Sequence, residues 1–211
     1  MSLYLRPDVH AAAIGDDLAL LDIAGDAYLC LPGAAAILVG GRQMAIAPGP
    51  MADTLIAAGL LAPDPPPDTE CSPPAPTRSI IHSPAIRGPG PRALIAAAGV
   101  VADIHQARAG QGLSPYLRIA EAQTELSRDP EATLAAARLF WAMGPWLPLE
   151  GECLLRSAML VSFLRRSGLA ADWVFGVRLW PFNAHCWVQA GDVCLNDDVE
   201  RLWAYTPIFR R

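Results

Sequence analysis

The first 60 or so residues alternate short apolar runs with turn-forming residues. Three apolar runs of strand length are separated by Gly15-Asp16-Asp17 and Gly25-Asp26: Val9 to Ile14, Leu18 to Ile23, and Ala27 to Leu31. Such spacing favours an antiparallel three-stranded meander. Short helices are expected over residues 34–39 and from Met51 to about Leu60. The pattern predicts a small winged-helix-like domain over residues 1–62.

A proline-rich stretch interrupts the hydrophobic pattern. Residues 63–91 hold ten of the chain's 20 prolines. Proline removes a backbone donor and disfavours helix at the residue before it, so this stretch is expected to be extended and largely irregular. We interpret it as a linker between two domains. The alternative is a long strap packed on the surface of one domain.

Helical periodicity dominates the next 75 residues. The predicted helices run from Arg92 to about Ala109, from Pro115 to about Leu126 behind Ser114, from Glu131 to Met143 behind Asp129, and from Glu152 to Arg166. Ser and Asp are favoured helix N-caps, and glycine or arginine at the far ends fits helix termini. Strand-like runs follow at 171–177, 184–189 and 193–195. Helices followed by a short antiparallel sheet predict an α+β domain over residues 92–211.

Composition and charge narrow the function classes. Hydrophobic residues make up 53% of the 211 residues, which excludes a disordered chain. The net charge of −5 argues against nucleic-acid binding by a basic face. The longest apolar run, residues 93–102, is about half of the ~20 residues that a membrane span requires. The five cysteines form no CxxC pair, so reduced thiols in a cytoplasmic protein are expected.

Cys153 lies in the first turn of the strongest predicted helix. The helix macrodipole and the free N–H groups of that turn favour a thiolate and could stabilise an oxyanion. The adjacent Glu150 and Glu152 would oppose this by raising the pKa of the thiol. Taken alone, a cysteine in this position is more often a small buried apolar residue.

His185 and Asp197 change that assessment. His185 lies in a strand-like run, and Asp197 follows the next predicted strand twelve residues later. The turn Ala190-Gly191-Asp192 would make the two strands a hairpin. A hairpin could bring Asp197 to His185, so that the carboxylate orients the imidazole toward Cys153.

These three residues lie in a longer stretch of sequence that resembles the lasso peptide biosynthesis B proteins. The matching segments are Glu152 to Ser157, Arg165 to Leu169, Phe175 to Arg178, Pro181 to Val188, and Asn196-Asp197. The resemblance implies a transglutaminase-like, papain-related fold that removes the leader from a ribosomally made precursor peptide. It implies Cys153 as nucleophile, His185 as base and Asp197 as the orienting acid. It also implies a partner, an ATP-dependent macrolactam synthetase that takes the freed core.

The sequence departs from this family in one position and leaves a second ambiguous. Cys186 follows the histidine, where the family usually has a small residue such as Ala. Alternation along a strand would point Cys186 away from His185 and place Trp187 on the same face as the imidazole. Asp198 neighbours Asp197, although the spacing from the strand end favours Asp197.

The N-terminal domain contains Leu20-Leu21-Asp22, Tyr28-Leu29-Cys30-Leu31 and the segment from Leu55 to Leu61. Through these segments it resembles PqqD-like leader-recognition domains. That resemblance implies capture of the leader peptide as an added strand, with main-chain hydrogen bonds and apolar pockets. The expected leader-binding residues are Tyr28, Leu29 and Cys30 on the third strand, with Met51 and Leu55 on the helix opposite.

Other functions remain as alternatives. The same triad could transfer an acyl group to an amine, as in transglutaminases, or both domains could form a non-catalytic peptide-binding scaffold. A DNA-binding regulator is disfavoured by the acidic charge. No cofactor and no metal are expected, because the chain has no GxxxxGK[ST] or HExxH motif, and His185 and Cys186 would face opposite sides of a strand.

Overall fold

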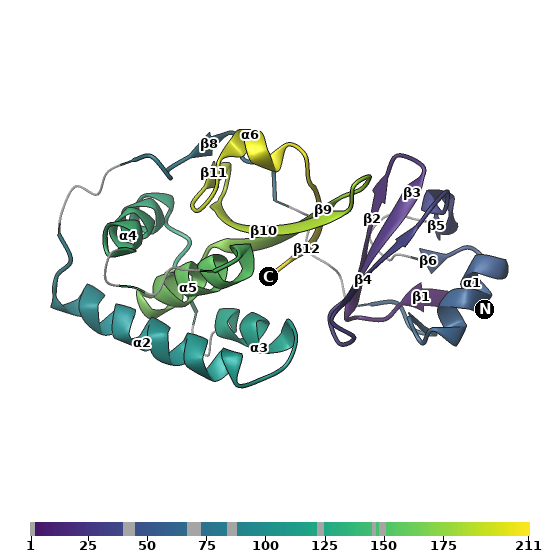
Figure 1. Ribbon diagram of the computed structural model, residues 1–211, viewed down its shortest axis with the longest axis horizontal. Helices are drawn as coiled ribbons and strands as arrows, with labels where there is room; N and C mark the ends of the chain where they lie inside the picture. The colour runs from purple at the N-terminus through teal and green to yellow at the C-terminus, as the bar shows by residue number, and fades with distance from the viewer. Residues whose placement is uncertain are drawn as a thin grey trace. The chain divides into compact units, whose positions relative to one another are not determined.

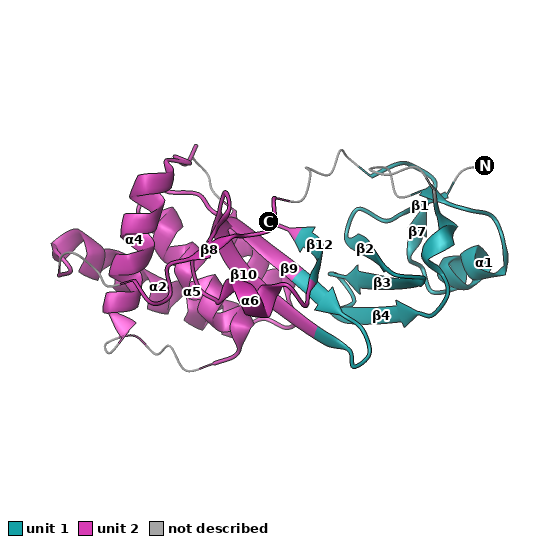
Figure 2. Ribbon diagram, turned by 90° about the horizontal axis from the view of Figure 1, so that it is seen from above, with its two compact units in different colours: residues 1–72, 176–183, 206–209 teal, residues 73–175, 184–205, 210–211 magenta. Residues whose placement is uncertain are grey.

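The chain divides into two compact units, which Figure 2 colours separately. The computed structural model describes residues 3–39, 45–66, 73–83, 88–121, 125–144, 147 and 151–211. Glu150, considered above, and Cys71, one of the five cysteines, lie outside these residues. Unit 1 comprises residues 1–72, 176–183 and 206–209, and unit 2 comprises 73–175, 184–205 and 210–211. The second half of the chain therefore contributes to both units.

Unit 1 contains the predicted meander. The strands are β2 (Val9–Ile14), β3 (Asp17–Asp22) and β4 (Ala27–Leu31), antiparallel in the order β2-β3-β4 (Figure 1). Gly15 has a φ of 61°, the left-handed conformation that a tight hairpin turn between β2 and β3 requires. β4 is one of the two edge strands of this sheet.

A second sheet in unit 1 was not predicted. Its short strands, in the order β5-β6-β1-β7, are β1 (Leu3–Leu5), β5 (Leu38–Val39), β6 (Ala45–Ile46) and β7 (Leu61–Ala62). The expected helix over 34–39 is wrong: a 3-10 turn, η1 (Ala35–Ile37), leads directly into β5. Pairing of Leu38 with Ile46 satisfies the backbone there, and β-branched residues favour a strand. The described part of unit 1 thus has one α-helix, α1 (Pro50–Ala57), fewer than the winged-helix-like pattern predicts.

The core of unit 1 joins both sheets and α1. Buried apolar residues from β1, β2, β3, β6 and α1 form one cluster, including Leu5, Val9, Leu18, Ile46 and Leu55. The segments 176–183 and 206–209 also contact the meander. Tyr28 on β4 packs against Phe182, with ring centroids 5.6 Å apart.

Unit 2 contains most of the helices of the described chain. They are α2 (Pro91–Arg108), α3 (Ser114–Leu117), the 3-10 helix η3 (Arg118–Ala120), α4 (Pro130–Ala142), α5 (Cys153–Arg166) and α6 (Val199–Leu202). Asp129 caps α4 as predicted, accepting hydrogen bonds from the backbone N–H groups of Glu131 and Ala132. The helix predicted to reach Leu126 ends at Ala120 instead. Glu121 is already extended, and Ser127 forms a backbone bridge with Leu169.

A five-stranded sheet supplies the strands of unit 2, although residues 176–178 of β9, Asn183 of β10 and residues 206–209 of β12 are assigned to unit 1. Its order is β12-β9-β10-β11-β8, with β8 (Arg78–Ser79), β9 (Asp172–Arg178), β10 (Asn183–Ala190), β11 (Val193–Cys194) and β12 (Thr206–Arg210). β10 and β11 form the predicted antiparallel hairpin, with Gln189 opposite Cys194. β12 and α6 were not predicted.

Part of the proline-rich stretch belongs to this sheet. β8 pairs in parallel with β11, and Thr77 and Arg78 hydrogen-bond the carboxylate of Asp192 at 2.7 and 3.0 Å. Residues 77–80 therefore form a short strap on unit 2.

Helix α5 is the central helix of unit 2. Nine of its residues are buried, and Asp103 of α2 accepts hydrogen bonds from Ser162 and Arg166 at 2.5 and 2.7 Å. Burial would raise the pKa of Asp103, but its bonds to Arg166 and Ser162 outweigh that effect and lower it. α5 is thus fixed on one side by the sheet core and on another by α2.

We predict that Phe163→Ala lowers the free energy of unfolding by about 3–5 kcal/mol, because Phe163 is 1% exposed and packs on Phe140. Urea unfolding monitored by circular dichroism measures this value. Ile95→Ala, at a site that is 72% exposed, is the matched control and should change it by less than about 0.5 kcal/mol. Equal effects of the two substitutions would contradict this packing.

Candidate active site

The structure places Cys153 as the first residue of α5. Glu152 occupies the N-cap position, and its side chain makes no capping hydrogen bond. The backbone N–H groups of the first turn are therefore not capped by that side chain, and the positive end of the helix macrodipole faces the thiol. Cys153 is only partly buried, so a substrate can reach it.

His185 and Asp197 come together as the hairpin predicted. His185 lies on β10, and the hydrogen bond from Leu195 N to Val188 O extends the hairpin beyond β11 toward Asp197. His185 Nε2 and Asp197 Oδ2 are 2.5 Å apart, and their side chains are 5% and 12% exposed. Because Nε2 is bound to Asp197, Nδ1 is the ring nitrogen available for the hydrogen bond with Cys153.

Asp198 does not share this position. Its carboxylate contacts His82 Nε2 at 3.1 Å on the exposed surface. Asp197 instead accepts a hydrogen bond from the backbone N–H of Asp198 at 2.8 Å, and its own carbonyl accepts one from Ser79 Oγ at 2.7 Å. The strap residue Ser79 thus helps to hold the carboxylate-bearing loop.

Cys153, His185 and Asp197 stabilise one another's charged forms. Hydrogen bonds from the thiol of Cys186 and from His185 lower the pKa of Cys153 to about 4, despite the opposing effect of burial. Burial alone would lower the pKa of His185, but its hydrogen bonds with Asp197 and Cys153 raise it to about 9. Burial would likewise raise the pKa of Asp197, but hydrogen bonds from His185 and the backbone N–H of Asp198, together with the positive charges of His185 and Arg201, lower it. The favoured state near neutral pH is a thiolate beside an imidazolium and a carboxylate.

A comparison with known families decides the class of this domain. Residues 97–210, a little over half of the chain, match the family described as the transglutaminase-like superfamily. The chain belongs to the transglutaminase-like superfamily. No curated protein and no solved structure matches the chain. The match covers Cys153, His185 and Asp197, so the transglutaminase-like domain contains all three.

A hydrogen-bonded network behind the triad was missed by the sequence analysis. Asn196 Oδ1 accepts from the backbone N–H of Val188 at 2.8 Å, and its Nδ2 donates to Ser157 Oγ at 2.8 Å. Ser157 Oγ in turn donates to the carbonyl of Cys186 at 3.3 Å. These bonds join α5, β10 and the loop after β11 in the transglutaminase-like domain. In the sequence, Asn196 adjoins Asp197 and Ser157 lies four residues after Cys153, and both fall within the segments that resemble the lasso peptide B proteins.

Aromatic rings surround the imidazole. Trp187 stacks on His185 with centroids 6.4 Å apart, which confirms that the two share a face of β10, and Tyr205 lies 5.2 Å away. Trp187 is buried and its Nε1 donates to Gln189 Oε1 at 2.7 Å. Arg156, for which the sequence suggested no role, lies over the ring of Trp141 at 5.3 Å. The rings of Trp187 and Tyr205 limit the access of water to the His185–Asp197 bond.

The structure does not put all five expected leader-binding residues on one surface. Alternation along β4 turns Leu29 to one face of the sheet, and Tyr28 and Cys30 to the other. Leu29 is 37% exposed, whereas Leu55 is buried in the core of unit 1, with Met51 packed at its border. Leu55 therefore supports α1 from within.

The described residues contain no group of three or more His, Cys, Asp or Glu side chains arranged to hold a metal ion. Within the same residues, no helix has the length and apolar character needed to cross a membrane.

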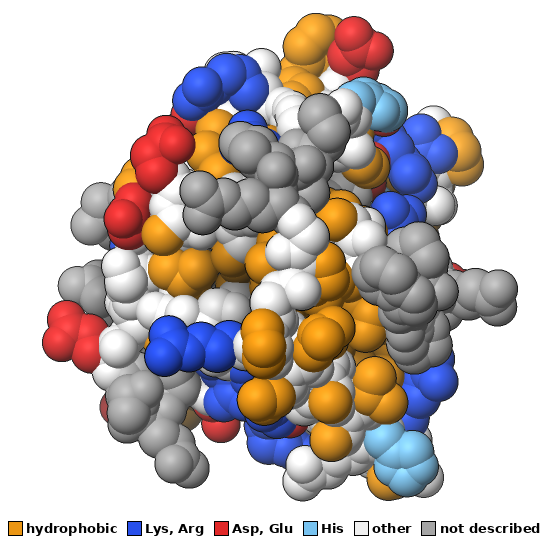
Figure 3. All heavy atoms as spheres, turned by 90° about the vertical axis from the view of Figure 1, so that its left-hand side faces the viewer, with side chains coloured by type: hydrophobic (Ala, Val, Ile, Leu, Met, Phe, Trp, Pro, Cys, Tyr) orange, Lys and Arg blue, Asp and Glu red, His pale blue; other side chains and the backbone are white. Residues whose placement is uncertain are grey.

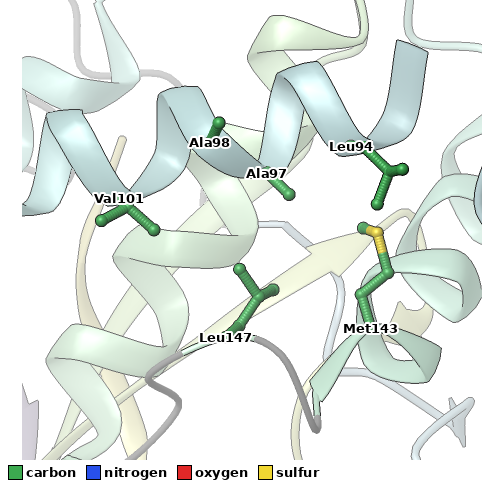
Figure 4. A pocket seen from close by; sticks show the side chains of 6 residues that line it. All are labelled: Leu94, Ala97, Ala98, Val101, Met143 and Leu147. Atoms are coloured by element: carbon green, nitrogen blue, oxygen red, sulfur yellow. The ribbon is translucent and has the colours of Figure 1, made fainter. Parts of the chain in front are cut away.

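A separate apolar depression lies on the transglutaminase-like domain. It has a volume of about 210 Å³ and is lined by Leu94, Ala97, Ala98, Val101, Met143 and Leu147. In Figure 4, Leu94, Ala97 and Val101 point from α2 toward Met143 and Leu147. Hydrophobic side chains gather on the face seen in Figure 3, the side on which α2 and α4 lie in Figure 1. Its lining carries no titratable group, so this depression has no part in the chemistry of the triad.

We predict that Asp197→Asn raises the pH midpoint of Cys153 alkylation by about one unit or more, because the imidazolium loses its carboxylate partner. The rate of iodoacetamide labelling of Cys153, measured across pH, gives this midpoint. Asp198→Asn is the matched control and should leave it unchanged. A higher pH midpoint in Asp198→Asn alone would mean that Asp198, and not Asp197, is the carboxylate partner of His185.

Proposed function

We propose that this protein is a cysteine peptidase that removes the leader from a ribosomally made precursor peptide, at the leader–core junction, during lasso peptide biosynthesis. The observation that carries the proposal is the triad: a low-pKa thiol at a helix N-terminus, joined to a buried His–Asp pair. Membership of the transglutaminase-like superfamily supports acyl transfer through a thioester. The resemblance to lasso peptide B proteins supplies the substrate class.

The geometry supports a two-step reaction. The Cys153 thiolate attacks the carbonyl carbon of the junction, and N–H groups in the first turn of α5 stabilise the oxyanion. The His185 imidazolium then donates its proton to the leaving amine, which frees the core peptide and leaves the leader as a thioester. His185 next takes a proton from water, whose oxygen attacks the thioester and releases the leader carboxylate. Asp197 orients the imidazole in both steps.

The N-terminal region is proposed as a PqqD-like, winged-helix-like leader-recognition domain over residues 1–62. Supporting this, β4 is an edge strand of its sheet, and an extended peptide could add beside it through main-chain hydrogen bonds. Tyr28, Leu29 and Cys30 would contact the leader from either face of β4, while Met51 and Leu55 hold α1 behind the sheet. Joining this domain to the peptidase domain (residues 92–211) through residues 63–91 would raise the effective concentration of the junction near Cys153.

The chemistry of the released core peptide indicates which enzyme would act after this one. Cleavage leaves a free α-amine on the core, which cannot form an amide without activation of a carboxylate. An ATP-dependent macrolactam synthetase of the same cytoplasmic pathway would perform that step, and the peptidase itself would need no cofactor.

The test is mass spectrometry of the pathway's precursor peptide after incubation with the protein, with and without the synthetase. We predict one cut by the wild type, giving a leader with a free carboxylate, and none by Cys153→Ala. Fluorescence anisotropy of labelled leader should give the same Kd for both proteins, because the substitution leaves the N-terminal domain intact.

Cys194→Ala is the matched control for loss of a buried thiol, and should still cut the precursor. A new amide or isopeptide in place of the free carboxylate would establish an acyltransferase instead. Equal formation of lasso product with Cys153→Ala and wild type would establish a scaffold. Either result would refute the peptidase.

A further inference from the structure

Cys186 is a buried nucleophile that the proposed reaction does not consume. It follows His185 on β10 and is 3% exposed. Its Sγ lies 3.7 Å from Ser157 Oγ, and Ser157 is one helical turn after Cys153 on α5. Residues four apart on a helix share a face, so the face of α5 that carries Cys153 is the one that meets Cys186.

The two thiols lie on facing elements, one at the start of α5 and the other on β10. Hydrogen bonding from the Cys186 thiol is the largest of the effects that lower the pKa of Cys153. The carbonyl of Cys186 is fixed by Ser157 Oγ, which Asn196 holds in turn. The position of Cys186 beside Cys153 is therefore set by the same bonds that position the triad.

We propose that Cys186 is the resolving cysteine of a reversible redox lock, which closes a Cys153–Cys186 disulfide when a peroxide oxidises Cys153. The lock goes beyond the proposed function, because it would block the nucleophile whatever acyl group Cys153 transfers.

The oxidation balances with one peroxide. The Cys153 thiolate attacks one oxygen of hydrogen peroxide, the O–O bond breaks, and the hydroxide that leaves takes a proton to become water, giving a sulfenic acid. The sulfur of Cys186 then attacks the sulfenic sulfur. The S–S bond forms, the S–O bond breaks, and the hydroxide leaves with the Cys186 proton as a second water. Two thiols and one peroxide thus become one disulfide and two waters, and a dithiol reductant reverses the change.

The electrostatics suit this division of roles. Cys153 is accessible and favours the thiolate, the form that reacts with peroxide. Burial and the adjacent negative charge of Cys153 raise the pKa of Cys186 and keep it a thiol in the active enzyme. Sulfenic acid formation removes that negative charge, which lets Cys186 ionise and attack.

Cys194 provides the matched control within the same domain. It is also fully buried, and its Sγ contacts Asn196 Oδ1 at 4.0 Å. The pKa of Cys153 is lowered by hydrogen bonding from Cys186, whereas Cys153 has no effect on the pKa of Cys194. The disulfide should therefore form between Cys153 and Cys186 and not between Cys153 and Cys194.

The experiment treats reduced full-length protein with a small excess of hydrogen peroxide and then blocks free thiols with iodoacetamide. Trypsin and a protease that cleaves before Asp place Cys186 and Cys194 on separate peptides, because Asp192 lies between them. Mass spectrometry should find the Cys153 peptide linked to the Cys186 peptide in wild type and in Cys194→Ala. Dithiothreitol should release both peptides. This readout needs no substrate, so it can fail or succeed independently of the peptidase proposal.

Cys186→Ala tests the consequence of losing the resolving thiol. Its Cys153 should gain two oxygen atoms as sulfinic acid, in a yield about tenfold or more above wild type, and dithiothreitol should not restore its alkylation. Wild-type Cys153 that gains two oxygens while Cys186 stays free would overturn the lock. A disulfide from Cys153 to Cys194 or Cys30 would overturn it as well.

Discussion

The buried hydrogen bond between His185 and Asp197 is the interaction on which the site depends. Both side chains lie almost out of solvent, where an isolated charge is strongly disfavoured. The carboxylate is tolerated because His185, the backbone N–H of Asp198 and the more distant Arg201 all compensate its charge. The imidazolium is tolerated because Asp197 lies on one side and the Cys153 thiolate on the other. Loss of any one of these charges would leave another buried without its partner.

The fold meets this requirement by anchoring three elements to one another. Cys153 begins α5, His185 lies on β10, and Asp197 follows β11. Asn196 and Ser157 connect all three elements through hydrogen bonds of 2.8 to 3.3 Å. The strap adds a fourth anchor, because Ser79 binds the carbonyl of Asp197 and the backbone N–H of Ile80 binds the carbonyl of Cys194. The same bonds place the Cys186 thiol against Cys153. Catalytic geometry and redox sensitivity would then share one set of contacts.

The parts that were predictable from the sequence carry local signals. The meander has turn residues between apolar runs, α4 has Asp129 and Pro130 at its start, and the β10–β11 hairpin has Gly191 at its turn with a φ of 60°. The pairing of His185 with Asp197 follows from that hairpin. By contrast, β12, the second sheet of unit 1 and the strap pair with residues far away in sequence, which short-range patterns do not reveal. The contact between Cys153 and Cys186 depends on how α5 packs on β10. Strand alternation indicated only which face of β10 Cys186 occupies.

The most direct test of this account is a pH titration of the ultraviolet thiolate absorbance, taken as wild type minus Cys153→Ala. The predicted signal appears with a midpoint near pH 4 and persists to alkaline pH. The sign follows from the charges: as pH falls through 4 the thiolate takes up a proton, whereas as pH rises through about 9 only the imidazolium loses one. Between these values both charges coexist. A midpoint near pH 9, the ordinary value for a thiol, would mean that Cys153 is not activated and would contradict the proposed catalytic site.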